Sequence, residues 1–141
     1  MSRIPARLRR LVVQRARRKC EYCQLSQVGQ EATFHVDHVV PSAKGGRTFL
    51  HNLALACVSC SLRKEARQSA CDPETGRRFR LFNPRRHYWD DHFCWEGVRL
   101  IGLTGTGRAT ISALEMNRPL ILAIRYEEAK RGRHPAKTKK I

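Results

Sequence analysis

Four of the six cysteines form two Cys-x-x-Cys pairs, a spacing typical of metal sites. Each pair can direct two thiolates toward one ion, and two pairs complete the closed four-sulfur shell of a structural zinc. A redox site would need only one pair, so the doubled pattern favours zinc. We therefore predict a structural Zn²⁺ site formed by Cys20, Cys23, Cys57 and Cys60. The other two, Cys71 and Cys94, have no such partner and are expected to be small buried apolar residues.

A second set of candidate catalytic or metal-binding residues lies between the two pairs, in the stretch FHVDHVVPSAKGGRTFLHNLALAC. Asp37 directly precedes His38 there, and His35 stands two residues before Asp37. Neighbouring residues of a regular strand point to opposite faces, so Asp37 and His38 can share a site only where the strand ends or bulges. Pro41, close behind, favours an ending. By the same periodicity, His35 and Asp37 are expected to share a face.

These residues need a small α+β frame to hold them. Residues 34–40 are expected to form a strand that stops at Pro41 and at a loop containing Gly45 and Gly46. A second short strand is expected at residues 53–56, and a helix from near Ser59 to about Gln68. The chain order is therefore strand, loop, strand, helix.

Further elements are expected on both sides of this frame. The apolar residues of 5–18 recur at helical spacing among arginines, which predicts a basic amphipathic helix. Strands are expected at 78–82 and 98–103, then a helix capped by Thr104 and a last helix opened by Pro119. The expected domain plan is a basic helix in 1–19, a core in 20–68, an extension packed on the core in 69–130, and a disordered basic tail in 131–141.

The charge of the chain indicates the class of partner. There are 28 lysines and arginines against 12 acidic residues, a formal net charge of +16. So much like charge repels itself in the compact folded state, and binding to a polyanion offsets this repulsion. The charge therefore favours nucleic acid as the partner over a membrane surface. No apolar run is long enough to cross a membrane, and the N-terminus lacks an apolar stretch of signal-peptide length. A cytoplasmic location is therefore expected, where reduced cysteines favour metal binding over disulfides.

The stretch from Cys20 to Lys64 resembles the HNH endonuclease family, in its branch with Cys-x-x-Cys pairs. The motifs that match are CEYC, VDHVVP, GG and NLALACVSC. The segment DPETGRRFRLFNPRRHYWDDHFCWEG, followed by LTGTGRATI, is also similar to a group of short bacterial HNH proteins. The resemblance implies a ββα-metal (His-Me finger) core. Together with the four-cysteine zinc knuckle, the N-terminal basic helix and the C-terminal strand and helix extension predicted above, this gives an α+β fold.

The resemblance also implies roles for three residues. Asp37 would hold a divalent cation, and His38 would be the general base that takes a proton from the attacking water. Their chemistry agrees with this division, since carboxylates suit Mg²⁺ or Mn²⁺ and a neutral imidazole is a good base near pH 7. Asn52 would brace the loop and orient His38 by hydrogen bonding.

One position departs from the family pattern. The family's last histidine or asparagine, a metal ligand, is here Ser61. A hydroxyl is a poorer ligand than an imidazole or an amide. Two explanations remain open: either Glu65, one helical turn further on, takes over metal binding, or the site is weakened or inactive.

Basic residues flank the candidate site in the sequence and are expected to bind phosphates without base-specific contacts. They stand on the first helix, beside the glycine loop and on the helix that follows the second strand. The nucleic-acid-binding candidates are Arg7, Arg10, Lys44, Arg47, Arg63 and Lys64.

The sequence thus favours a metal-dependent HNH endonuclease that hydrolyses phosphodiester bonds in DNA, with RNA as another possible partner. The first alternative is a catalytically impaired, zinc-stabilised module that only binds nucleic acid. The second is a basic accessory protein that binds RNA or a protein complex. The pair Asp37 and His38 favours the enzyme, whereas Ser61 favours the binding module.

Overall fold

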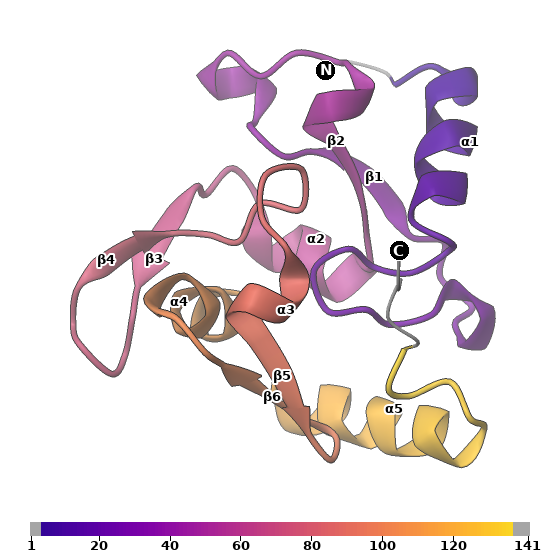
Figure 1. Cartoon of the computed structure of the whole chain (residues 1–141). Helices are drawn as coiled ribbons and strands as arrows, with labels where there is room; N and C mark the ends of the chain where they lie inside the picture. The colour runs from indigo at the N-terminus through magenta and orange to yellow at the C-terminus, as the bar shows by residue number, and fades with distance from the viewer. Residues whose placement is uncertain (1–3, 137–141) are drawn as a thin grey trace.

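The computed structural model describes residues 4–136. Within them the chain forms small antiparallel hairpins and short helices, arranged around one core (Figure 1). The elements are α1 (Ala6–Arg15), β1 (His35–His38), β2 (Leu53–Ala56), α2 (Val58–Lys64), β3 (Ser69–Cys71), β4 (Arg78–Arg80), α3 (Trp89–His92), β5 (Phe93–Glu96), β6 (Arg99–Gly102), α4 (Gly105–Ala113) and α5 (Pro119–Lys130).

The expected order strand, loop, strand, helix is confirmed. β1 and β2 pair antiparallel, with His38 opposite Leu53 at the loop end, and α2 follows β2 directly. The loop turns back sharply at its two glycines. Gly45 has a left-handed φ of 89°, and a Cβ on Gly46 would overlap the carbonyl oxygen of Val40. Both positions therefore require glycine.

Two helices end earlier than their residue patterns predict. α1 stops at Arg15 because Arg17 and Arg18 take left-handed φ values of 55° and 58°. α2 stops at Lys64 because Glu65 has a φ of 48°, so the helix does not reach Gln68. The strands β3 and β5 and the short helix α3 were not expected from the sequence.

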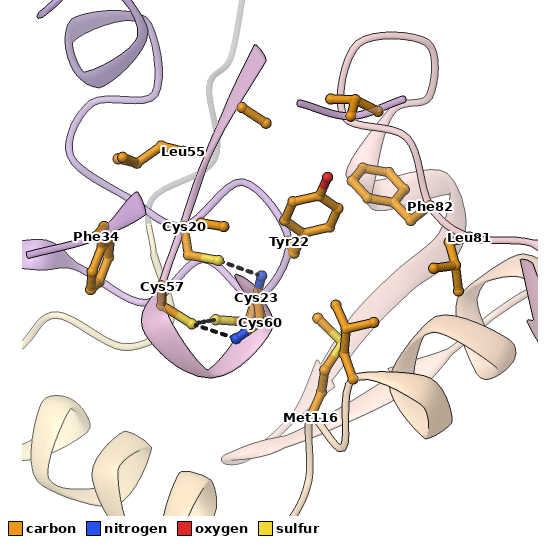
Figure 2. Packing of buried hydrophobic residues seen from close by; sticks show 14 of the residues in the cluster. Cys20, Tyr22, Cys23, Phe34, Leu55, Cys57, Cys60, Leu81, Phe82 and Met116 are labelled. Atoms are coloured by element: carbon orange, nitrogen blue, oxygen red, sulfur yellow. Dashed lines mark hydrogen bonds between the residues drawn. The ribbon is translucent and has the colours of Figure 1, made fainter. Parts of the chain in front are cut away.

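One hydrophobic core joins the ββα unit to the C-terminal extension. Tyr22, 1 % exposed, meets the edge of the Phe82 ring at a centroid distance of 6.4 Å. Figure 2 shows Tyr22 between the cysteines on one side and Phe82, Leu81 and Met116 on the other. The extension therefore buries the back of the cysteine site.

The C-terminal elements begin where the sequence predicts. Thr104 caps α4 by accepting a hydrogen bond from the Gly107 amide at 3.0 Å, and Pro119 occupies the first turn of α5. Of the segment expected to be disordered, residues 131–136 fold against the body. Arg133 pairs with Glu128 at 2.8 Å and His134 contacts the Gly97 carbonyl at 2.9 Å, while residues 137–141 lie outside the described part. Among the described helices, none is long and apolar enough to cross a membrane.

The His92 imidazole gives a test of this packing through pH. Its Nδ1 lies 2.7 Å from the Thr104 hydroxyl, and its ring centre lies 5.0 Å from that of His87. Burial, and then the neighbouring His87, lower the pKa of His92 below its ordinary value of 6.5. Between pH 6.5 and the lowered pKa of the folded state, His92 is therefore protonated in the unfolded chain but neutral in the folded chain. Acidification through this window should therefore destabilise the fold.

We expect His92→Gln to remove this part of the pH dependence. Urea unfolding at pH 7.5 and 5.5 would measure it, with His134→Gln as the control. Loss of zinc at the lower pH affects all three proteins alike. An equal fall in stability for wild type and His92→Gln would contradict the assignment.

Candidate active site and zinc centre

The four predicted cysteines come together at one point. Cys20 and Cys23 lie in the turn after α1, Cys57 precedes α2 and Cys60 lies in its first turn. All are buried, and their sulfurs lie within 4.8 Å of one another, with Cys23 Sγ and Cys57 Sγ 3.7 Å apart. Tetrahedral zinc with Zn–S bonds of about 2.3 Å places its sulfurs about 3.8 Å apart. The cluster therefore fits a structural zinc ion, as the sequence predicts.

Backbone amides and charge agree with a cation at this site. The amides of Cys23 and Cys60 each donate to the first sulfur of their own pair at 3.4 Å. Hydrogen bonds from neighbouring cysteines lower the pKa of Cys57, whereas hydrogen bonding to Cys20 first, and also burial, raise those of Cys23 and Cys60. Four thiolates buried this close together would repel one another, and a divalent ion offsets that repulsion.

A buried arginine from α5 lies next to the cysteine cluster. Arg125 is 3 % exposed and lines a small apolar cavity together with Cys23, Cys57 and Cys60. Its guanidinium donates to the carbonyls of Met116 at 2.6 Å and Val98 at 3.0 Å. Burial lowers the pKa of Arg125, and the negative charge of the cysteines opposes that shift. Sequence reasoning missed this residue, because one arginine among the apolar positions of a helix carries no distinctive signal.

The face of β1 that carries His35 and Asp37 turns toward α2. His35 Nδ1 lies 2.8 Å from the Ser61 hydroxyl, one turn of α2 before Lys64. The Asp37 carboxylate is close enough to Lys64 to oppose the lowering of the Lys64 pKa by burial. His35 therefore contacts Ser61 directly, and Asp37, two residues further along β1, lies near Lys64 at the end of α2.

The position of Lys64 corrects one prediction. The side chain is 4 % exposed, and its ammonium donates to the Val39 carbonyl at 3.0 Å. It ties α2 to the end of β1, immediately after His38, and is not a surface contact for phosphate.

His38 is held on the loop side of the site. β1 ends at His38, so the expected strand end is present, and His38 Nε2 lies 2.8 Å from the Thr48 hydroxyl. Asp37 faces α2 while His38 contacts the loop, so the two are adjacent in the chain but have different partners. Thr48 was not singled out from the sequence, where it is one of several polar residues in the glycine loop.

Asn52 clamps the base of the loop. Its carboxamide oxygen accepts from the Val40 amide at 2.9 Å, and its nitrogen donates to the carbonyls of Val40 at 3.1 Å and Arg47 at 2.9 Å. These bonds fix the backbone beside His38 and beside Thr48. Asn52 therefore braces the loop as expected, but it positions His38 through the backbone and not by bonding its ring.

Glu65 is placed differently from the helical expectation. It lies beyond the end of α2, is exposed and has a left-handed φ of 48°. Helical spacing therefore does not direct its carboxylate to the face of Ser61. Within residues 4–136, the cysteine cluster is the only place where three or more histidine, cysteine or carboxylate ligands gather closely.

Four of the six predicted phosphate contacts are exposed. Arg7 and Arg10 lie on α1, and Lys44 and Arg47 lie on the β1–β2 loop. α1 packs against β1, β2 and the turn Leu50–Asn52, so these cations lie at one end of the molecule (Figure 1). Arg63, in contrast, pairs with Glu115 of the extension at 3.0 Å.

The two strands, the clamped loop, α2 and the cysteines together define a ββα unit with a zinc knuckle. The model of the HNH endonuclease family matches residues 20–67, about a third of the chain. This segment is therefore an HNH endonuclease domain of the Cys-x-x-Cys branch. No curated protein and no solved structure matches the chain.

Proposed function

We propose that this protein is a metal-dependent endonuclease that hydrolyses phosphodiester bonds in DNA. The observation that carries the proposal is His38, held at the end of β1 by Thr48 inside an HNH domain whose loop is clamped by Asn52. Such a rigid imidazole is suited to proton transfer, whereas a pure binding module has no need of one.

His38 would act as the base that receives a proton from water. The tautomer that donates from Nε2 to Thr48 keeps a lone pair on Nδ1, and this nitrogen can accept the proton. The Thr48 hydroxyl would then hold the orientation of the ring, while Asn52 fixes the backbone of the loop at Val40 and Arg47.

Asp37 and Ser61 carry oxygen donors of the kind that a hard divalent cation prefers. Asp37 offers a carboxylate and Ser61 a hydroxyl, and Mg²⁺ commonly takes only one or two protein carboxylates besides water and phosphate oxygens. Mg²⁺ or Mn²⁺ bound there would supply a Lewis acid for the scissile phosphate. Lys64 donates to the Val39 carbonyl and thereby holds the end of α2 against the end of β1.

Substitutions at Ser61 and Glu65 test how the cation is held. Ser61→Asn places an amide oxygen at the family's ligand position and should lower the Mg²⁺ concentration needed for half-maximal cleavage. Glu65→Gln should change that concentration by less than about twofold, because an exposed side chain outside the helix is a surface position. A plasmid-nicking assay over a series of Mg²⁺ and Mn²⁺ concentrations measures both.

The same assay decides between the enzyme and the binding module. A strong rise in the metal requirement with Glu65→Gln would return the ligand role to Glu65. Identical trace activity for wild type, Ser61→Asn and a variant without His38, with every metal, would leave the binding module as the function.

The exposed cations at the α1 end would bind DNA through its phosphates, so affinity should depend steeply on salt. Six to ten phosphate contacts predict a loss of about 10³–10⁵ in affinity between 50 and 200 mM salt. Replacing Arg7 and Arg10 by glutamine should reduce the salt slope by about one for each residue. Fluorescence anisotropy with a labelled duplex measures the slope.

The matched control removes two charges elsewhere. Arg99 and Arg131 are exposed on β6 and after α5, at the opposite end of the molecule, and their glutamine variants should leave the slope nearly unchanged (Figure 1). Equal effects of the two double variants would mean that net charge, and not the α1 face, governs binding.

A further inference from the structure

A cavity of about 290 Å³ lies between the end of α1 and the segment that leads into α3. It is distinct from the small apolar cavity at the zinc centre, although Cys20 also lines it. Its lining combines cationic and aromatic side chains, including Arg17, Lys19, His87, Tyr88 and Trp89. Its volume is close to the lower end of the range for small-molecule pockets, which suits one nucleotide.

The cationic side of the cavity is shaped by the turn after α1. Arg17 and Arg18 both have left-handed φ values, which are unfavourable for residues with a side chain. This turn lets Arg17 and Lys19 both line the cavity. Arg15, also in the lining, donates to the carbonyls of Leu50 at 2.8 Å and Leu53 at 2.6 Å, on both sides of Asn52. The cavity is thus one side chain away from the clamped loop.

The aromatic side offers surfaces for stacking. Tyr88 is 75 % exposed, so the face of its ring is accessible to a ligand. Trp89 beside it is fixed, because its indole nitrogen donates to the Tyr22 carbonyl at 2.8 Å. Exposed aromatic rings next to cations are how proteins commonly hold unpaired bases, with the rings on the bases and the cations on the phosphates.

Two carboxylates of the lining limit what fits. Glu21 is already engaged by Arg85 and by the Leu55 amide at 2.9 Å, while Asp90 is exposed. A ligand with a single backbone phosphate and a flat base is therefore favoured over a polyphosphate.

We propose that this cavity binds one unpaired nucleobase of a DNA strand, stacked on Tyr88, with its phosphate near Arg17 and Lys19. The proposal rests on the proposed function in one respect, namely that DNA is the ligand. It adds that the protein prefers DNA with an unpaired base at this point, such as a single strand or a distorted duplex.

Binding of a twelve-nucleotide oligo-dT strand tests the cavity without any cleavage. Titrations without added magnesium would follow the tryptophan fluorescence, since Trp89 lines the cavity, and a labelled strand would give affinity by anisotropy. Tyr88→Ala should weaken binding about 5- to 150-fold, the usual range for losing one stacked base. Tyr126→Ala, which removes a 58 % exposed tyrosine from α5, should leave affinity unchanged.

An abasic strand of the same length separates stacking from charge. It carries the same phosphates, so wild type and Tyr88→Ala should bind it equally, whereas Arg17→Gln should weaken it. Equal binding of oligo-dT by Tyr88→Ala and Tyr126→Ala would overturn the cavity proposal. If Tyr88→Ala weakens binding of oligo-dT but the wild type does not cleave plasmid, the nuclease proposal is wrong and the cavity proposal stands.

Discussion

Replacing His38 by alanine is expected to lower DNA cleavage about 10²–10⁴-fold, the usual contribution of a general base. The change removes the imidazole at the end of β1 that contacts Thr48 of the clamped loop, and it leaves Asp37 and Ser61 in place. Zinc content and affinity for duplex DNA should stay as in wild type. Plasmid nicking, elemental analysis and anisotropy on the same preparation measure the three quantities.

Two further variants make this result specific. Thr48→Val removes the hydroxyl that fixes the ring and should give a smaller fall in cleavage, with unchanged metal requirement. His134→Ala removes a histidine that contacts Gly97, far along the chain from the HNH domain, and should cleave like wild type. Cleavage by His38→Ala at the wild-type rate would mean that another group is the base.

Replacing Cys57 by serine is expected to unfold most of the protein. Structural zinc in small domains contributes about 10–16 kcal/mol, which is comparable to the whole net stability of about 5–15 kcal/mol. Cys57 precedes α2 and contacts Cys23 across the cluster, so its loss opens the shell between the two halves of the knuckle. Circular dichroism, urea unfolding and zinc content would show the loss together.

The matched control uses a cysteine outside the cluster. Cys94 is exposed on β5, and Cys94→Ser should retain about one zinc per chain and nearly all of the wild-type stability. Less than about half an equivalent of zinc per chain in wild-type protein purified without chelators would contradict the zinc assignment.

The parts of the fold that could be predicted are those with local signals. β2 has the expected bounds, because a short apolar run followed by a Cys-x-x-Cys pair allows few other arrangements. Thr104 and Pro119 mark helix starts by chemistry that depends only on neighbouring residues. The zinc cluster was equally predictable, since two Cys-x-x-Cys pairs together supply the four thiolates of a structural zinc site.

The parts that could not be predicted depend on tertiary contacts. The sequence predicts a surface charge at Lys64, but the ammonium of this last residue of α2 donates to the Val39 carbonyl of another segment. Cys71 and Cys94 were expected to be buried, and both are exposed because the outward faces of β3 and β5 carry them. The roles proposed for Asp37, His38 and Asn52 stay predictions, although the clamp by Asn52 gives one of them a geometric basis.

The Asn52 clamp divides the β1–β2 loop into a fixed base and a projecting part. The clamp closes the loop at Val40 and Arg47, so the residues between them, Ser42–Lys44 among them, project from a base that is already fixed. Insertions or new side chains in this projecting part would change the surface next to His38, while the imidazole at the base keeps its place. One asparagine therefore makes the length and surface of the loop independent of the position of His38.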